Sequence, residues 1–239
     1  MKILLLCFLI FAKMQAQDAA QFTFGFGSDH KLYEWNRSQA DIFGFEPVEL
    51  SLADYTFRLT WCFNSVVLYK NQGKYYGWAK TYIINSNKPE ETFGMTYTVD
   101  SVTVKSLIAL VDSTNIRQIP TDNLIKGWPD GFDGTGYTIE EKHNGSYTYK
   151  NYWSPASHNF TEAQTIALFV ERFEEIGNFY NLTKPVYELR PFRYYRVGCG
   201  VAGIKILTKT ESKKEDRRYA LRRQNYEAIQ QREAALKPK

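Results

Sequence analysis

Long apolar runs are scarce in this chain of 239 residues. The uncharged stretch from Ile3 to Phe11 has nine residues, whereas a helix that spans a bilayer needs about 20. This stretch follows a basic start at Lys2 and precedes Ala16, an order typical of a secretory signal peptide. We therefore expect residues 1–16 to be a cleaved signal peptide, the mature protein to be secreted or periplasmic, and no transmembrane segment to remain after cleavage.

Histidine is also scarce, and the known catalytic and metal-binding spacings are missing. The three histidines, His30, His143 and His158, are far apart, and neither a His-x-x-x-His nor a paired-cysteine spacing occurs. The ligand spacings of zinc sites are therefore absent, and so is the G-x-S-x-G elbow of serine hydrolases. We expect no metal site.

Cysteine is equally scarce, and removal of the signal peptide leaves only Cys62 and Cys199. Export would place both in an oxidising compartment, where a disulfide between them is permitted. Both lie in apolar, strand-like segments, so two buried thiols explain them equally well.

The segment Gly198–Gly203 matches the dinucleotide pattern G-x-G-x-x-G, but the residues after it continue like a strand instead of opening a helix. We therefore expect no cofactor.

Aromatic residues are abundant, at 16% of the chain, and charge is unevenly distributed. The net charge is +4, of which the leader contributes +2 and residues 205–239, with eleven Lys or Arg against five Asp or Glu, contribute +6. Residues 17–204 therefore carry −4. A basic tail would contact an anionic envelope surface or a protein partner, or would lie in solvent or against its own body. We expect no nucleic-acid partner.

Hydrophobic periodicity predicts an α+β fold in which antiparallel β-hairpins are each followed by an amphipathic helix, with a charged helix at the C-terminus. Tight turns are indicated at Gln72-Gly73 and Asn144-Gly145. The predicted strands are 22–26, 55–63, 66–70, 75–84, 96–99, 137–142, 146–153 and parts of 186–208; the predicted helices are 104–111, a segment that begins at Thr161, and 212–237. Residues 27–54 are expected to be irregular, and Pro185 to prevent continuation of the second helix.

These elements divide the mature chain into a globular body, residues 17–207, and a charged helical tail, residues 208–239. The apolar positions of the tail, Tyr219, Tyr226, Ile229 and Leu236, form only a thin seam and indicate a coiled coil weakly. We expect most of the tail to be exposed.

One segment combines an Asp-Gly turn after Trp128, a strand with Tyr137-x-x-Glu140, a glycine hairpin at Gly145 and a Trp153-Ser154-Pro155 exit. This combination resembles a group of uncharacterised bacterial exported domains, in which a similar strand pair and helix precede it. The resemblance covers residues 54–180. It implies a small α+β module and brings no known activity with it.

Three interpretations of this segment stay open. With a two-residue turn at Asn144-Gly145, Glu140 falls opposite Tyr149 and shares its face with Tyr147 and Trp153. Glu140 would then act as a general acid with Asp133 as its partner, or Tyr147, Tyr149 and Trp153 would bind a sugar-like ligand by stacking.

The third interpretation is structural. Asp130 and Asp133 would shape tight turns, and Glu140 would pair with Lys142 or with a backbone amide. We expect an exported, non-catalytic binding or envelope-interaction module. The alternative is a secreted hydrolase that uses Asp133 and Glu140.

Overall fold

The computed structural model describes residues 22–40, 46–129, 131, 133–196, 198 and 209–236. The predicted signal peptide, Asp130, Cys199 and most of the Gly198–Gly203 segment lie outside these ranges. The strands are β1 (Thr23–Phe24), β2 (Tyr55–Trp61), β3 (Asn64–Asn71), β4 (Lys74–Asn85), β5 (Thr92–Val99), β6 (Gly136–His143), β7 (Ser146–Trp153) and β8 (Tyr195–Arg196). The helices are α2 (His30–Ala40), α3 (Ser101–Ser113), α4 (Thr161–Gly177), α5 (Phe179–Leu189) and α6 (Lys209–Leu236), with 3-10 turns η2 (Val48–Leu50), η3 (Asn115–Gln118), η4 (Asp122–Leu124) and η5 (Pro155–Ser157).

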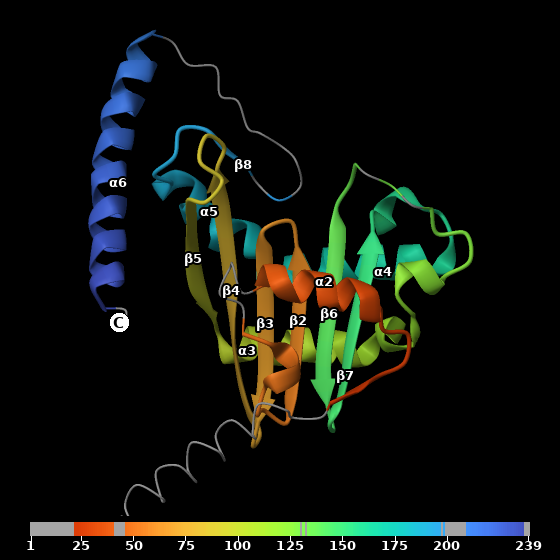
Figure 1. The fold of residues 1–239 in the computed structure, drawn as a ribbon. Helices are drawn as coiled ribbons and strands as arrows, with labels where there is room; N and C mark the ends of the chain where they lie inside the picture. Colours follow the sequence, from red (N-terminus) through yellow and green to blue (C-terminus); the bar gives the residue numbers. More distant parts are fainter. Residues whose placement is uncertain are drawn as a thin grey trace, which may run out of the picture.

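The strands form one mixed sheet in the order β1-β7-β6-β2-β3-β4-β5, and β8 pairs with β4 (Figure 1). Among the described residues, every strand pair is antiparallel except β1 with β7. The predicted plan is confirmed: α3 follows the strands β2 to β5, and α4 follows the hairpin β6–β7. The two units share a single sheet because β2 and β6 pair with each other.

Tight turns set the register of the hairpins. Gln72 and Gly73 both have positive φ, and so do Asn144 and Gly145, as a type I′ turn requires. The turn at Asn144-Gly145 places Glu140 opposite Tyr149, as the sequence predicted. The segment 55–63 was predicted as one strand, but β2 ends at Trp61 and Cys62, with φ +50°, begins the turn into β3.

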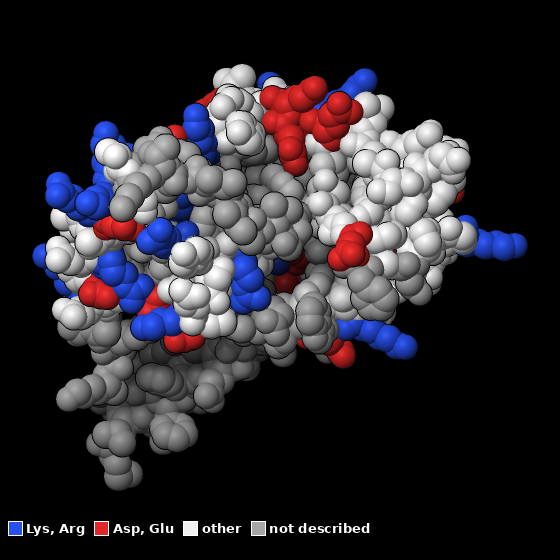
Figure 2. Space-filling view, turned by 90° about the horizontal axis from the view of Figure 1, so that it is seen from above, with Lys and Arg blue, Asp and Glu red and all other residues white. Residues whose placement is uncertain are grey.

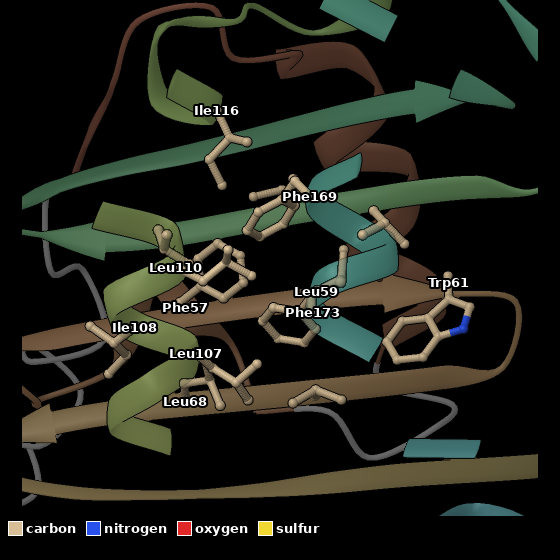
Figure 3. Close-up of a cluster of buried hydrophobic side chains, with 14 of the residues drawn as sticks. Phe57, Leu59, Trp61, Leu68, Leu107, Ile108, Leu110, Ile116, Phe169 and Phe173 are labelled. Carbon is tan, nitrogen blue, oxygen red and sulfur yellow. The ribbon is translucent and has the colours of Figure 1, made fainter. Parts of the chain in front are cut away.

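The main core lies between one face of the sheet and the helices α3 and α4 (Figure 3). Phe57 and Leu59 of β2 contribute to it from the sheet, Leu107 from α3, and Phe169 and Phe173 from α4, and all five are at most 1% exposed. The Asp100 side chain caps α3 by accepting hydrogen bonds from two backbone amides of its first turn. Because side chains alternate along a strand, Thr56, Arg58 and Thr60 of β2 belong to the opposite face.

Three further segments differ from the sequence-based expectation. Residues 30–40, expected to be irregular, form α2, whose Leu32 and Tyr33 pack on buried tyrosines of β7. Residues 179–189 form α5, which contains Pro185 and is held by the buried side chains of Phe179 and Val186. The strand expected from residue 186 onward is reduced, in the described residues, to the short β8.

Within the described residues, no helix is both long enough and apolar enough to cross a bilayer.

Candidate functional site

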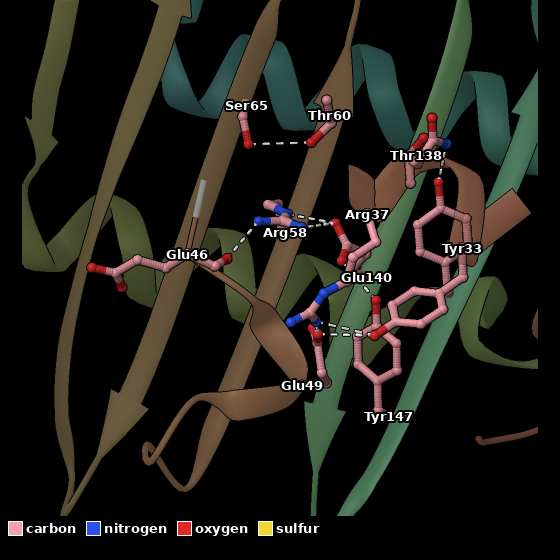
Figure 4. Close-up of polar contacts among 12 residues, drawn as sticks. Tyr33, Arg37, Glu46, Glu49, Arg58, Thr60, Ser65, Thr138, Glu140 and Tyr147 are labelled. Carbon is pink, nitrogen blue, oxygen red and sulfur yellow. Dashed lines mark hydrogen bonds and ion pairs between the residues drawn. The ribbon is translucent and has the colours of Figure 1, made fainter. Parts of the chain in front are cut away.

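The predicted acid Glu140 lies in a buried ion pair on the sheet face opposite the main core. Arg58 of β2 and Glu140 of β6 are direct cross-strand partners, and the guanidinium Nε and Nη2 both lie 2.5 Å from Glu140 Oε2 (Figure 4). The Tyr147 hydroxyl donates to the other carboxylate oxygen at 2.7 Å. Arg58 is 6% exposed and Glu140 is 4% exposed. Both oxygens of the proposed acid are therefore bound inside the protein.

The electrostatics of this cluster favour the ion pair. Burial alone would lower the pKa of Arg58, but the charge of Glu140 and its hydrogen bond raise this pKa above its ordinary value. Burial, followed by the nearby Glu140 charge, raises the pKa of Tyr147 well above its ordinary value. The site is therefore a neutral pair of Arg58 and Glu140, and the Tyr147 hydroxyl beside it keeps its proton.

A second pair of charges covers the first. Glu49 of η2 is 2% exposed and accepts a hydrogen bond from the Tyr33 hydroxyl of α2 at 2.9 Å. Arg37 of α2 forms an ion pair with the same carboxylate. The Arg58 guanidinium also donates to the backbone oxygen of Glu46 at 2.8 Å. In Figure 4 these side chains connect α2 and the 46–50 segment to the sheet face around Glu140.

The two tyrosines predicted to stack on a ligand belong to a small core beneath α2. Tyr147 is 0% exposed and Tyr149 is 3% exposed. The ring of Tyr147 packs edge-on against Phe22 and Tyr33, with centroids 5.2 and 5.6 Å apart. The Tyr149 hydroxyl accepts a hydrogen bond from Asn36 of α2. A ligand would reach these rings only after α2 had moved, so the stacking role of both tyrosines stays a prediction.

Trp153 and Asp133 lie at the other end of the β6–β7 hairpin. Trp153 is half-buried, pairs with Gly136 and packs against His158 with a centroid distance of 5.6 Å. Asp133 is exposed in the loop before β6. Gly136 and Glu140 are four residues apart, which is about 13 Å along a strand. The structure therefore does not bring Asp133 or Trp153 to the carboxylate of Glu140.

The expected partner of Glu140 was wrong, and the actual partner was missed. Lys142 donates to the backbone oxygen of Ser51 at 2.6 Å, whereas Glu140 pairs with Arg58, 82 residues away in sequence. One signal was present: Arg58 is the charged residue of an otherwise apolar and threonine-containing strand, which indicates a buried partner of opposite charge. The sequence did not say which strand would carry that partner.

The tail helix α6 contacts the body through a few specific side chains. Arg223 binds the Glu91 carboxylate with two nitrogens, one of them at 2.8 Å from Oε1, and the Tyr226 hydroxyl donates to the Thr92 backbone oxygen at 2.9 Å. The Tyr226 ring also packs edge-on against Phe93 and Phe192. The seam predicted from sequence is therefore partly a docking surface for the body.

The opposite side of α6 is basic. Lys213, Lys214, Arg217 and Arg218 are all exposed. Three acidic side chains of the described helix form ion pairs: Asp216 with Arg193 of the body, Glu227 with Arg223, and Glu215 with Arg218. Seen from above, Lys and Arg side chains gather on the side of the molecule where Figure 1 places α6 (Figure 2).

The described residues contain no group of three His, Cys, Asp or Glu side chains placed to hold a metal ion. Fold and site together define an α+β protein whose best-formed polar cluster is a buried ion-pair network beneath a helix. No protein-family model matches this chain, and no curated protein or solved structure matches it. The resemblance to exported domains therefore stays a prediction.

Proposed function

We propose that the protein is an exported, non-catalytic interaction module that binds an anionic envelope surface through the outer side of α6. The observation that carries the proposal is the division of charge on this helix. Its cations at 213, 214, 217 and 218 are exposed, while Asp216, Glu227 and Glu215 are engaged in ion pairs, the last of them with Arg218. A helix with a cationic outer side and exposed apolar residues among the cations is suited to an anionic lipid surface.

The geometry around Glu140 supports a non-catalytic role. A general acid has to reach a substrate, and both oxygens of this carboxylate are bound by buried partners. Asp133, the proposed partner of the hydrolase alternative, is exposed near the opposite end of the hairpin. No observation favours the hydrolase over the binding module.

Sedimentation with lipid vesicles tests the proposal on the mature chain, residues 17–239. We expect binding to vesicles that contain phosphatidylglycerol, little binding to phosphatidylcholine alone, and weaker binding as salt rises. The double variant Lys214→Glu with Arg217→Glu should bind at least about tenfold more weakly, since each basic residue near such a surface contributes on the order of 1 kcal/mol.

The matched control is Lys74→Glu with Lys105→Glu, which makes the same change in charge at exposed positions of β4 and α3. This control should bind like the wild type. Equal loss in the control and the α6 variant would show only a general effect of net charge, and absence of binding by the wild type would refute the proposal.

A further inference from the structure

Two helices of this protein present apolar side chains to solvent at the same spacing. On α6, Leu221 is 61% exposed and Ile229 is 51% exposed. On α4, Leu168 is 48% exposed and Ile176 is 40% exposed. The two residues of each pair are eight positions apart, which is about 12 Å along a helix. The angle between the two side chains around the helix axis is therefore the same in α6 and in α4.

The side chains around the two pairs have opposite charge. Around Leu221 the exposed neighbours on the same side of α6 include Lys214, Arg217 and Arg218, at positions −7, −4 and −3, and Arg218 also pairs with Glu215. Further along, Arg232 is exposed beside Ile229.

The outer side of α4 is mainly acidic. Glu171 and Glu175 are exposed and follow Leu168 at +3 and +7. Arg172 is the exposed cation on the same side of this helix. The carboxylates outnumber it, so this surface is complementary to the cationic side of α6.

The two surfaces cannot meet within one chain. α6 is docked to the body through Tyr219, Arg223 and Tyr226, so its basic side points away from that body. α4 packs on the sheet through Phe169 and Phe173, so its acidic side also points outward. In Figure 1, α6 lies outside the sheet edge formed by β5, whereas α4 lies toward the other edge, near β7.

We infer that the outer side of α6 in one copy packs on the outer side of α4 in a second copy. Leu221 and Ile229 would lie against Leu168 and Ile176, with the α6 cations beside the α4 carboxylates. The contact joins two different surfaces. It closes into a dimer if it forms reciprocally between two copies, and otherwise it continues into a ring or an open chain of copies. It uses the same side of α6 as the proposed function but needs no membrane.

Analytical ultracentrifugation of the mature chain without lipid tests the inference. We expect concentration-dependent association at low salt that weakens as salt rises. Charge reversal on α4, Glu171→Lys with Glu175→Lys, should raise the dissociation constant at least about tenfold, as should reversal on α6 by Lys214→Glu with Arg217→Glu. Mixing the two reversed variants should restore association between them, because the charges are complementary again.

A neutral pair of variants separates packing from charge. Leu168→Ser and Leu221→Ser, both at exposed positions, should each weaken association while circular dichroism stays unchanged. A wild type that remains monomeric, an α4 variant that associates like the wild type, or reversed variants that fail to associate with each other would overturn the inference.

The vesicle assay distinguishes failure of this inference from failure of the proposed function. The α4 variant should bind vesicles at least as well as the wild type, since α4 is not part of the proposed membrane surface and the two added lysines only increase attraction to an anionic surface. A wild type that self-associates and does not bind vesicles refutes only the membrane proposal. A wild type that binds vesicles and stays monomeric refutes only the self-association.

Discussion

Arg58 and Glu140 face each other across the central strand pair β2–β6, with nitrogen–oxygen distances of 2.5 Å and almost no exposure to solvent. Loss of one partner leaves the other buried and uncompensated, which costs about 3 to 5 kcal/mol in other proteins. Glu140→Gln and Arg58→Met should therefore each lower the free energy of unfolding by about this amount, measured by urea denaturation.

The double variant Arg58→Met with Glu140→Met should recover most of the loss, because apolar side chains of similar size often replace a buried pair at little cost. The exposed substitution Glu171→Gln serves as a control and should change the free energy by less than about 0.5 kcal/mol. A Glu140→Gln variant as stable as the wild type would show that the ion pair does not stabilise the fold.

The burial of Lys150 on β7 leads us to expect an unusual dependence of stability on pH. Its ammonium group is buried and donates to the backbone oxygens of Arg117 and Ile119 at 2.8 and 2.9 Å, and burial lowers its pKa to about 8. In the unfolded chain the pKa is near 10.4. The folded state therefore binds fewer protons between these values, and the free energy of unfolding should rise with pH across this window, by about 3 kcal/mol at most.

The measurement is urea unfolding of the wild type and of Lys150→Met between pH 8 and 10, and the rise should be absent in the variant. Above pH 10 an opposite effect begins, because burial raises the pKa of Tyr69 to about 12 and the folded state holds its proton more tightly. A wild-type profile that is flat or falling from pH 8 to 10 would contradict the prediction.

We expect the docking of α6 to depend on Glu91. The hydrogen bond from Arg223 lowers the pKa of Glu91 to about 2, against an ordinary value of 4.5. Its contribution is therefore complete above pH 4.5 and is lost as pH falls toward 2. Hydrogen exchange should show α6 becoming less protected across this range, and Glu91→Gln should have the same effect at neutral pH. The neighbouring exposed Glu90→Gln is the matched control, and equal exchange in both variants would disprove the dependence.

The pairing of Cys62 with Cys199 stays a prediction that the structure makes more specific. Cys62 is disulfide-bonded, and a side chain at Gly198 would overlap the backbone of Cys62, so the chain next to Cys199 lies against it. Peptide mapping without reductant should recover the two cysteines in one linked pair. Cys199→Ser should lower stability by about 4 to 5 kcal/mol in the chain-entropy model. A free thiol at either position in protein purified without reductant would refute the pairing.

Several parts of the fold could be predicted from sequence because short-range physics decides them. Asn144-Gly145 adopts a turn that needs positive φ twice, and this turn alone sets the register that places Glu140 opposite Tyr149. Asp100 caps α3 because its side chain reaches amides two and three residues away. The alternation and helical periodicity of the longer segments likewise determined the α+β class.

Only the tertiary structure decided which distant residues meet. The partner of Glu140 depends on the pairing of β2 with β6, and no local pattern encodes a contact across 82 residues. Tyr147 and Tyr149 are two positions apart on one face of β7, a pattern that fits exposed and buried aromatic residues equally well. They are buried because α2 packs over them. The two sides of α6 also differ because of tertiary contacts. Arg223 and Tyr226 face the body because they contact Glu91 and Phe93.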